Sequence, residues 1–292
     1  MKTKFHPLRM LALIAIGAMT LTSCSNDDGE VVNDTNDEAN AEISVETITM
    51  ADEADMVDEE LTNITLDIIA SDEAEANGFT AKVSDFLPPC VTVTTVVTAT
   101  SVTRTVDFGD GCELPTGNTL AGSFTISHSV DPDQPARTLS VETSDDFFFN
   151  ALNVVGSKTI VRSINDAGNP NANKSASLVV TWPSGDSFNY SATKNREWIE
   201  GVGTGFWGDN VFLLSGNVNF TSLAGVNYSK ETLVPLRREW ACRFIVSGIV
   251  QWTREDTSIS LDFGDGSCDP FGTLTLPSGE EQTIRLRRFL AN

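Results

Sequence analysis

The strongest constraint on the fold is a set of segments rich in β-branched residues, which begin after Cys90 and recur to the end of the chain. The first of them reads VTVTTVVTATSVTRTV, a composition that favours strands over helices. Similar segments follow it at Ser123–Val130, Arg137–Asn150, Ser157–Ile164, Ser175–Trp182, Val211–Thr221, Arg243–Thr253 and Thr283–Phe289. Turn-forming residues separate these segments, including Pro183–Asp186 and the polar stretch Asn165–Asn173, which we expect to be a loop.

These segments predict an all-β body of about a dozen strands, arranged as an antiparallel meander that forms a sandwich or a strongly curved half-barrel. Helical patterns do not alternate with the strands, so a dinucleotide-binding type of fold is excluded. Trp182, Trp240 and Trp252 lie within strand patterns, which predicts that they belong to the core. Phe147–Phe149 places aromatic neighbours on both faces, which predicts a strand that is covered on both sides.

Four cysteines of this body fall in two similar frames. Cys90 is followed by a strand pair and then by DFGDGC, which ends at Cys112; Cys242 is followed by a strand pair and then by DFGDGSC, which ends at Cys268. The midpoint of each frame is polar, so a hairpin turning there would place the two cysteines opposite each other, at a distance that a disulfide can span. Among the three pairings that are possible, we therefore predict Cys90–Cys112 and Cys242–Cys268.

The register of the second hairpin can be predicted in the same way. Without a bulge, an apolar residue of one strand would face a serine of the other. A one-residue bulge within Gly264–Ser267 would pair Val246 with Phe263 and Val250 with Ile259, so that apolar residues meet on one face. We therefore predict the bulged register, which would also explain why this motif contains glycines.

The first residues of the chain have the pattern of a secretory signal. Lys2, Lys4 and Arg9 precede the apolar run LALIAIGAMTL, which is too short to span a membrane. The four residues Leu21–Cys24 then resemble the lipobox of bacterial lipoproteins. This resemblance implies cleavage before Cys24 and attachment of acyl chains to it. More than one acyl chain would anchor the protein stably in a membrane.

The residues that follow Cys24 bear on localisation. Ser25 at the second mature position resembles the sorting pattern of outer-membrane lipoproteins, and the acidic cluster Ser25–Glu30 is similar to the surface-export signal of Bacteroidetes lipoproteins. The same cluster also fits the beginning of an acidic linker. These resemblances imply a lipid-anchored protein of the outer membrane, either exposed at the cell surface or facing the periplasm.

The charge of the chain is concentrated near its N-terminus. The whole sequence has 41 acidic and 19 basic residues, a formal charge of −22, and 18 of the acids lie between Ser25 and Ala81, where there is no lysine or arginine. We therefore expect most of the charge to belong to a tether rather than to the folded body. Strong acidity also argues against a nucleic acid as partner.

The later part of the acidic segment predicts one helix. Apolar residues recur there at helical spacing: Met50, Ala54, Val57, Leu61, Ile64 and Ile68. This stripe predicts a helix of about five turns that packs on the body, with Thr49 as its N-cap. The expected organisation is a signal peptide at 1–23, an acidic tether at 24–48, a helix and linker at 49–84, and a disulfide-braced β domain at 85–292.

A wider resemblance rests on the two cysteine frames together with Arg196–Gly201 (REWIEG) and Trp240–Gly248 (WACRFIVSG). These segments resemble a family of exported Bacteroidetes lipoproteins with paired Cys…DFGDG(x)C repeats, over Cys90 to Arg287. The resemblance implies the location and the fold, and it implies no activity. The DFGDG motif alone is similar to a motif of polycystic-kidney-type β-sandwich domains in surface proteins. The flanking cysteines of this chain are a departure from that motif.

The two DFGDG motifs are also candidate ligand sites. Asp107 with Asp110, and Asp262 with Asp265, offer carboxylate oxygens of the kind that Ca²⁺ prefers. Two acids in each copy are too few for a site without further oxygen ligands, so we interpret the motifs as polar turns in which aspartate bonds its own backbone. Calcium binding stays as the alternative, and no other cofactor is expected.

A second candidate is the loop around Phe206 and Trp207, where aromatic residues stand between glycines. Exposed, these rings would bind a glycan or a protein; folded inward, they would cap the end of a sheet. After the signal is removed, His128 is the one histidine, which excludes multi-histidine metal sites and disfavours a histidine-dependent triad. No sequence motif of a phosphate loop or a dinucleotide fold is present.

The sequence therefore predicts a protein that is not an enzyme, with a binding or structural role at the outer membrane. Its expected partners are the membrane, through the acyl chains on Cys24, and an outer-membrane protein or a glycan. One alternative is a glycan-binding accessory subunit of a polysaccharide-uptake system. Another is a hydrolase that uses paired carboxylates, for which no local motif singles out a pair.

Overall fold

The computed structural model describes residues 43–76, 87–130, 138–204 and 207–286. They belong to one compact unit, Glu42–Asn292. Within these ranges the chain forms one long α-helix, one short 3₁₀ helix and sixteen strands that join in a single antiparallel sheet. The predicted all-β class with one helix near the N-terminus is confirmed. The signal peptide, Cys24 and the residues up to 42 lie outside the described ranges.

The helices are α1 (Val45–Ala76) and η1 (Trp207–Asp209). The strands are β1 (Thr92–Val97), β2 (Ser101–Asp107), β3 (Cys112–Glu113), β4 (Thr119–Ala121), β5 (Ser123–Ser129), β6 (Thr138–Thr143), β7 (Phe148–Phe149), β8 (Leu152–Ile164), β9 (Pro170–Thr181), β10 (Ser187–Glu200), β11 (Val211–Ser222), β12 (Asn227–Glu239), β13 (Ile245–Arg254), β14 (Thr257–Asp265), β15 (Phe271–Thr275) and β16 (Glu281–Arg285).

The sheet follows the chain as a meander. Its main path runs β1-β2-β5-β6-β8-β9-β10-β11-β12-β13-β14-β15-β16, while the short strands β3, β4 and β7 pair beside it. The two ends of the path, β1 and β16, do not pair with each other in the described part of the chain. The sheet is therefore open, as expected of a half-barrel rather than of two packed sheets.

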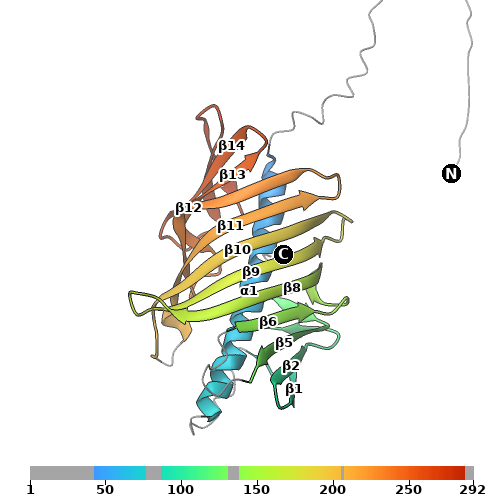
Figure 1. Cartoon of the computed structure of the whole chain (residues 1–292). Helices are drawn as coiled ribbons and strands as arrows, with labels where there is room; N and C mark the ends of the chain where they lie inside the picture. Colours follow the sequence, from blue (N-terminus) through green and yellow to red (C-terminus); the bar gives the residue numbers. More distant parts are fainter. Residues whose placement is uncertain (1–42, 77–86, 131–137, 205–206, 287–292) are drawn as a thin grey trace, which may run out of the picture. The chain divides into compact units, whose positions relative to one another are not determined.

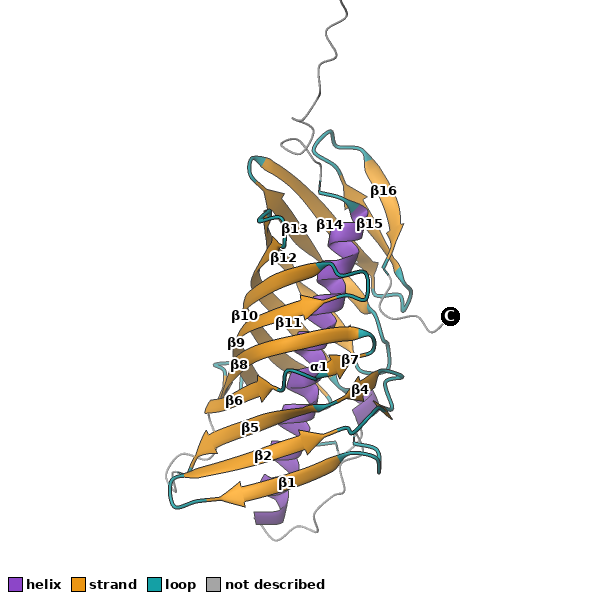
Figure 2. Cartoon of the chain, turned by 90° about the vertical axis from the view of Figure 1, so that its right-hand side faces the viewer, coloured by secondary structure: helices purple, strands orange, loops and turns teal. Residues whose placement is uncertain are grey.

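The sheet curves around α1. The strands cross the helix and succeed one another along its length, so that the helix lies against the inner face (Figures 1 and 2). The core forms between the two: Ile48, Leu61 and Ile64 of α1 are fully buried together with inward-facing residues of the sheet such as Phe124 and Phe220. The helix is thus the centre of the body, where the sequence had predicted only that it packs on the body.

The helix begins earlier than predicted. Its first residue is Val45, and the Ser44 hydroxyl caps it by accepting a hydrogen bond from the Thr47 backbone N–H at 3.1 Å. Thr49 lies inside the first turns, where its hydroxyl donates to the Val45 carbonyl. The prediction of Thr49 as N-cap is wrong, because the apolar spacing used to find the start did not include the buried Ile48.

The second hairpin has a different register from the predicted one. Val250 lies opposite Leu261, and Trp252 lies opposite Ile259, so apolar residues still meet but two residues away from the predicted pairs. The reason is the tight turn between β13 and β14, in which Glu255 takes a positive φ of 52°. A two-residue turn fixes the register of a hairpin. The pairing shifts by one residue where Gly248 of β13 faces both Phe263 and Gly264 of β14, so a bulge is present and includes Gly264, the first glycine of the DFGDG motif.

Several strand predictions are confirmed, and others need correction. The sequence missed β10 and β12 as strands, and it assigned Pro170–Asn173 to a loop although β9 begins at Pro170. It also expected a strand covered on both sides at Phe147–Phe149, whereas Phe148 is 39% exposed and only its two neighbours are buried. Many side chains of these strands are polar or face the solvent, so the sequence pattern for a strand is weak there. Hydrogen bonding to the neighbouring strands makes these segments strands.

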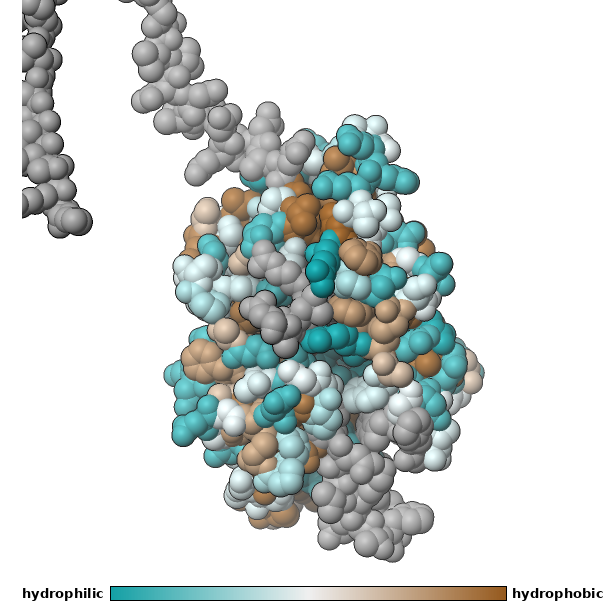
Figure 3. All heavy atoms as spheres, turned by 180° about the vertical axis from the view of Figure 1, so that it is seen from behind, coloured by the Kyte–Doolittle hydropathy of each residue, from teal (hydrophilic) through white to brown (hydrophobic). Residues whose placement is uncertain are grey.

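The tryptophans differ in their burial. Trp182 and Trp252 are buried core residues, as predicted, and Trp240 is partly buried against the core. Seen from behind, hydrophilic and hydrophobic side chains are intermingled over the described surface (Figure 3). Among the described residues, no helix is both long enough and apolar enough to cross a membrane.

Candidate functional site

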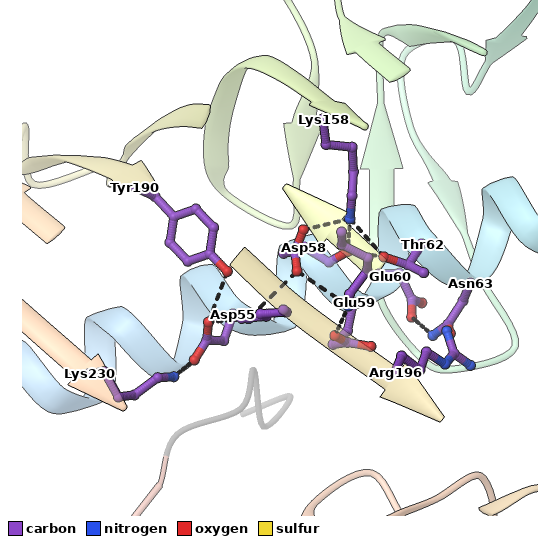
Figure 4. A network of polar contacts seen from close by, with 12 residues as sticks. Asp55, Asp58, Glu59, Glu60, Thr62, Asn63, Lys158, Tyr190, Arg196 and Lys230 are labelled. Carbon is purple, nitrogen blue, oxygen red and sulfur yellow. Dashed lines mark hydrogen bonds and ion pairs between the residues drawn. The ribbon is translucent and has the colours of Figure 1, made fainter. Parts of the chain in front are cut away.

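The most unusual chemistry of this structure is a cluster of charged side chains between α1 and the inner face of the sheet (Figure 4). Eleven acidic residues and no basic ones lie in the sequence of α1. The sheet turns lysines toward them from four of its strands. These lysines are Lys158 of β8, Lys174 of β9, Lys194 of β10 and Lys230 of β12. We call these four lysines, with Asp55, Asp58 and Glu59 of the helix, the inner charge cluster.

Asp58 is the centre of the inner charge cluster. The Lys158 ammonium donates hydrogen bonds to Asp58 Oδ1 at 2.5 Å, to the Asp58 main-chain carbonyl at 2.7 Å and to the Thr62 hydroxyl at 2.6 Å. Both charged side chains are almost completely buried, with 0% and 1% of their surface exposed. The other Asp58 oxygen lies 3.5 Å from the ammonium groups of Lys174 and Lys194. One carboxylate is therefore neutralised by three lysines from three neighbouring strands.

This arrangement changes the proton affinities of both partners. Burial alone would raise the pKa of Asp58, but the positive charges of Lys158, Lys174 and Lys194 hold that pKa well below its ordinary value. Burial lowers the pKa of Lys158 to about 8, against the opposing effect of Asp58. Asp58 is therefore ionised at neutral pH although water does not reach it.

Two further carboxylates complete the inner charge cluster. Asp55 accepts a hydrogen bond from the Tyr190 hydroxyl at 3.0 Å and from Lys194 at 2.5 Å, and it pairs with Lys230 through its other oxygen. Glu59 pairs with Lys174. Burial would raise the pKa of Glu59, but Lys174 and Arg196 keep it below its ordinary value. Burial, followed by the nearby negative charges, raises the pKa of Tyr190, so its hydroxyl stays a donor.

Other polar contacts hold the remaining length of the helix. Trp182 Nε1 donates to Glu53 at 2.8 Å, and the Thr116 hydroxyl donates to Glu60 at 2.7 Å. Near the C-terminal end of α1, Arg162 binds Glu73 with two hydrogen bonds of 2.6 and 3.0 Å. A pair between Arg104 and Asp72 lies at the same end. The sheet therefore recognises the helix by charge along most of its length.

These contacts correct the expectation that the acidic charge belongs to a tether. Eleven of the eighteen acids between Ser25 and Ala81 lie on α1, and many of these are buried against the sheet. The sequence did contain a signal for this. Lysines such as Lys158 and Lys174 occupy positions of their strands that alternation assigns to the inner face, between residues such as Ala172 and Ala176 that are buried. An acidic helix is the partner that such lysines require.

The geometry limits what the inner charge cluster can do chemically. Each of its carboxylates lies against at least one lysine, so none is available as a general base or as one of two catalytic carboxylates. A cavity of about 50 Å³ lies beside Asp55, Glu59, Lys194 and Lys230. This volume accommodates a few water molecules and is too small for a sugar or a peptide. The inner charge cluster is therefore built to hold the helix.

The buried carboxylates make the stability of the protein sensitive to acid. Because the pKa of Asp58 lies below its ordinary value of 3.8 in the folded state, the unfolded state binds more protons over this range. The stabilisation is complete above that ordinary value and is lost as the pH falls below it. We expect the urea midpoint to fall as the pH is lowered from about 4 to about 2, and to fall less steeply in Asp58→Asn. An equal slope in the variant would contradict this assignment.

The two predicted disulfides are confirmed. Cys90 and Cys112 have sulfur atoms 2.02 Å apart and Cα atoms 5.8 Å apart, and Cys242 and Cys268 have corresponding distances of 2.05 and 5.7 Å. The first joins Cys90, two residues before β1, to the first residue of β3, and the second joins the segment before β13 to the one after β14. Each disulfide therefore closes the base of one hairpin, as the midpoint argument predicted.

The two DFGDG motifs form the same local turn. Asp107 Oδ1 accepts a hydrogen bond from the Gly109 backbone N–H at 2.8 Å, and Asp262 Oδ1 accepts one from Gly264 at 2.8 Å. This is the turn structure that the sequence favoured. Asp110 is exposed, and Asp265 bonds Ser267. Across the described ranges no group of three or more His, Cys, Asp or Glu residues is placed to hold a metal ion, and calcium binding stays an untested alternative.

The predicted ligand loop is only partly described. Phe206 lies outside the described residues, and Trp207 begins η1 with a side chain that is likewise outside them. The neighbouring Thr204 hydroxyl donates to the Asp209 carboxylate at 3.1 Å. The predicted binding role of the two rings therefore stays a prediction. Comparison with known proteins supplies no further assignment, because no family model, no curated protein and no solved structure matches this chain.

Proposed function

We propose that this protein is an exported lipoprotein, anchored at the outer membrane by acyl chains on Cys24, with a non-catalytic binding or structural role. The observation that carries the proposal is the segment Leu21–Cys24, which stands directly after a basic and then apolar signal sequence. In this arrangement the acyl chains would anchor the mature N-terminus, and residues 25–42 would join it to the body. Two acyl chains give the stable attachment that such a role needs.

The cysteines support export. All four cysteines of the body form disulfides, and such bonds persist in oxidising compartments such as the periplasm or the cell surface. Cys24 is the one cysteine of the sequence outside these two pairs. This division suits a protein in which four thiols brace the fold and the fifth carries lipid.

The inner charge cluster supports a role without catalysis. A catalytic carboxylate must reach its substrate, whereas Asp58 and Lys158 are sealed between α1 and the sheet. Their charges neutralise each other and fix the helix in place. The parts of the body that remain available to a partner are its outer face and its loops, which suits a binding or structural protein.

Lipid attachment is tested by Cys24→Ala in a bacterial host that acylates lipoproteins. We expect the variant to lose labelling by a palmitate analogue and to leave the outer-membrane fraction. Ser23→Ala is the matched control, because it keeps Cys24 and a small residue before it, and it should be labelled and fractionated like the original protein. A Cys24→Ala variant that is still labelled would overturn the proposal.

A further inference from the structure

The outer face of the sheet carries a regular polar surface that the proposed function does not use. Side chains alternate between the two faces along each strand, so the neighbours of the residues that contact α1 point outward. On β8 the buried Lys158 stands between Ser157 and Thr159, and on β10 the buried Ala192 stands between Ser191 and Thr193. The strand register brings such outward residues into two continuous rows.

The first row crosses eleven strands from β1 to β14. In order it consists of Thr94, Thr105, Thr125, Glu142, Ser157, Ser177, Ser191, Asn219, Ser229, Thr253 and Ser258. The second row runs beside it from β2 to β15. It consists of Thr103, Ser127, Ser140, Thr159, Ser175, Thr193, Asn217, Glu231, Gln251, Ser260 and Thr275. We call the two together the outer rows.

The composition of the outer rows is unlike that of the rest of the chain. Of their 22 residues only Glu142 and Glu231 are charged, although charged residues make up 21% of the whole sequence and the chain is strongly acidic. Strand propensity explains the threonines but not the rest, because asparagine is depleted in strands and serine has no preference for them. The rows therefore contain few charged residues and are rich in small polar side chains.

The middle of the outer rows is open to a ligand. On the five strands β8 to β12, all the residues of the rows are exposed except Thr159, which is half-buried. Within the described part of the chain, the uncharged side chains of this stretch make no hydrogen bond to other protein groups. Each hydroxyl and amide can both donate and accept. Apart from Glu231 of β12, the stretch therefore presents uncharged hydrogen-bonding groups, repeated once per strand in each row.

The geometry suits a linear ligand. Neighbouring strands are about 4.8 Å apart, so each row repeats a hydroxyl or amide at that interval. The strands cross α1 and follow one another along its length (Figures 1 and 2). A row that passes from strand to strand therefore runs in the direction of the helix. A polymer lying along the rows would meet one polar group for each strand that it crosses.

We infer that the outer rows bind a neutral, unbranched polysaccharide in an extended conformation. Its hydroxyl groups, like those of the protein, donate and accept hydrogen bonds without charge. An acidic polymer is disfavoured because the chain carries a formal charge of −22 and the rows contain no lysine or arginine. This inference deepens the proposed function by naming the partner of an anchored binding protein. Neither Phe206 nor Trp207 belongs to the outer rows.

The inference is tested by retention of the purified full-length protein, in mild detergent, on insoluble neutral polysaccharides. The probes are microcrystalline cellulose, chitin and mannan, with carboxymethyl cellulose as the charged counterpart of the first. We expect retention on at least one neutral probe. Carboxymethyl cellulose should retain the protein more weakly than cellulose does, because its negative charges meet an acidic protein.

The contacting face is tested with Ser157→Glu combined with Asn217→Glu, which places two negative charges in the middle of the outer rows without touching the core. We expect retention to fall by about tenfold, as for the loss of one or two hydrogen bonds. The control combines Thr95→Glu with Thr283→Glu, two exposed strand positions outside the rows. It adds the same charge and should be retained like the original protein.

Two results would overturn the inference. The first is absence of retention on all three neutral probes. The second is retention that the Ser157→Glu and Asn217→Glu variant shares with the control. Because retention is measured on purified protein, neither result depends on the acylation of Cys24. A failure of this inference is therefore distinguishable from a failure of the proposed membrane anchoring.

Discussion

Replacing Lys158 with methionine is expected to lower the free energy of unfolding by about 3–5 kcal/mol, the usual cost of breaking a buried ion pair from one side. Methionine fills a similar volume, so the effect comes from the charge rather than from a cavity. Asp58 would lose its closest cation and one of the donors to its main-chain carbonyl, while only 1% of its side chain is exposed to water. Urea denaturation followed by circular dichroism measures the change.

Removing both charges should be less costly than the two single changes suggest. In Lys158→Met combined with Asp58→Leu, no buried carboxylate is left without its cation, and Lys174 and Lys194 keep Glu59 and Asp55 as partners. We expect the loss in the double variant to be smaller than the sum of the single losses by about 0.5–3 kcal/mol. Additive losses would show that the two side chains do not act as a pair.

Arg162→Met supplies the matched control for a helix contact nearer the surface. Arg162 and Glu73 are joined by two hydrogen bonds, but their side chains are 30% and 37% exposed. We expect a loss of only about 0–1 kcal/mol, because water solvates either partner when the other is absent. If Lys158→Met were no more destabilising than this control, the inner charge cluster would not be what holds α1.

The second large effect is expected from the disulfides. Changing Cys242 and Cys268 together to alanine should lower the free energy of unfolding by about 3 kcal/mol, because the unfolded chain gains the freedom of an open loop. Alanine is the replacement because it is small and apolar, which suits the buried position of Cys242. The measurement is urea denaturation of the oxidised protein and of the double variant under the same conditions.

The other disulfide serves as an internal comparison. The bonded cysteines are separated by 22 residues in the first pair and by 26 in the second, so the chain-entropy contributions should differ by less than about 0.2 kcal/mol. We therefore expect Cys90→Ala with Cys112→Ala to cost nearly the same. A loss below about 1 kcal/mol from either pair would contradict the view that both hairpins are braced in the same way.

The features that could be predicted from the sequence are those that depend on nearby residues. Runs of β-branched residues predicted most strands, because side-chain crowding acts within a segment. The midpoint of each cysteine frame predicted both disulfides, because a hairpin is symmetric about its turn. The same midpoint also placed the turn of the second hairpin at Arg254–Asp256, but it could not fix the exact turn, since the positive φ of Glu255 has no clear sequence signal. The register of the second hairpin was wrong by two residues for that reason.

The candidate site depended on contacts between distant parts of the chain. Lys158 and Asp58 are 100 residues apart, and Lys194 and Asp55 are 139 apart. The sequence showed an acidic segment and a set of strand lysines, but it could not show that the strands curve around the helix and bring the two together. A charged residue on a strand is solvated or buried according to the face it occupies and the element that covers that face.

By itself, the sequence determined the all-β class, the helix, the two disulfides and the prediction of an acylated Cys24, because each rests on local composition or on spacing along the chain. Only the tertiary structure decided where the acidic charge goes and which polar residues share a face. The inner charge cluster needs four strands to wrap one helix, and the outer rows need the registers of more than ten strands to agree. These arrangements depend on the pairing of strands that are far apart in the sequence. In such pairing, a slip of one residue moves a side chain to the opposite face of the sheet.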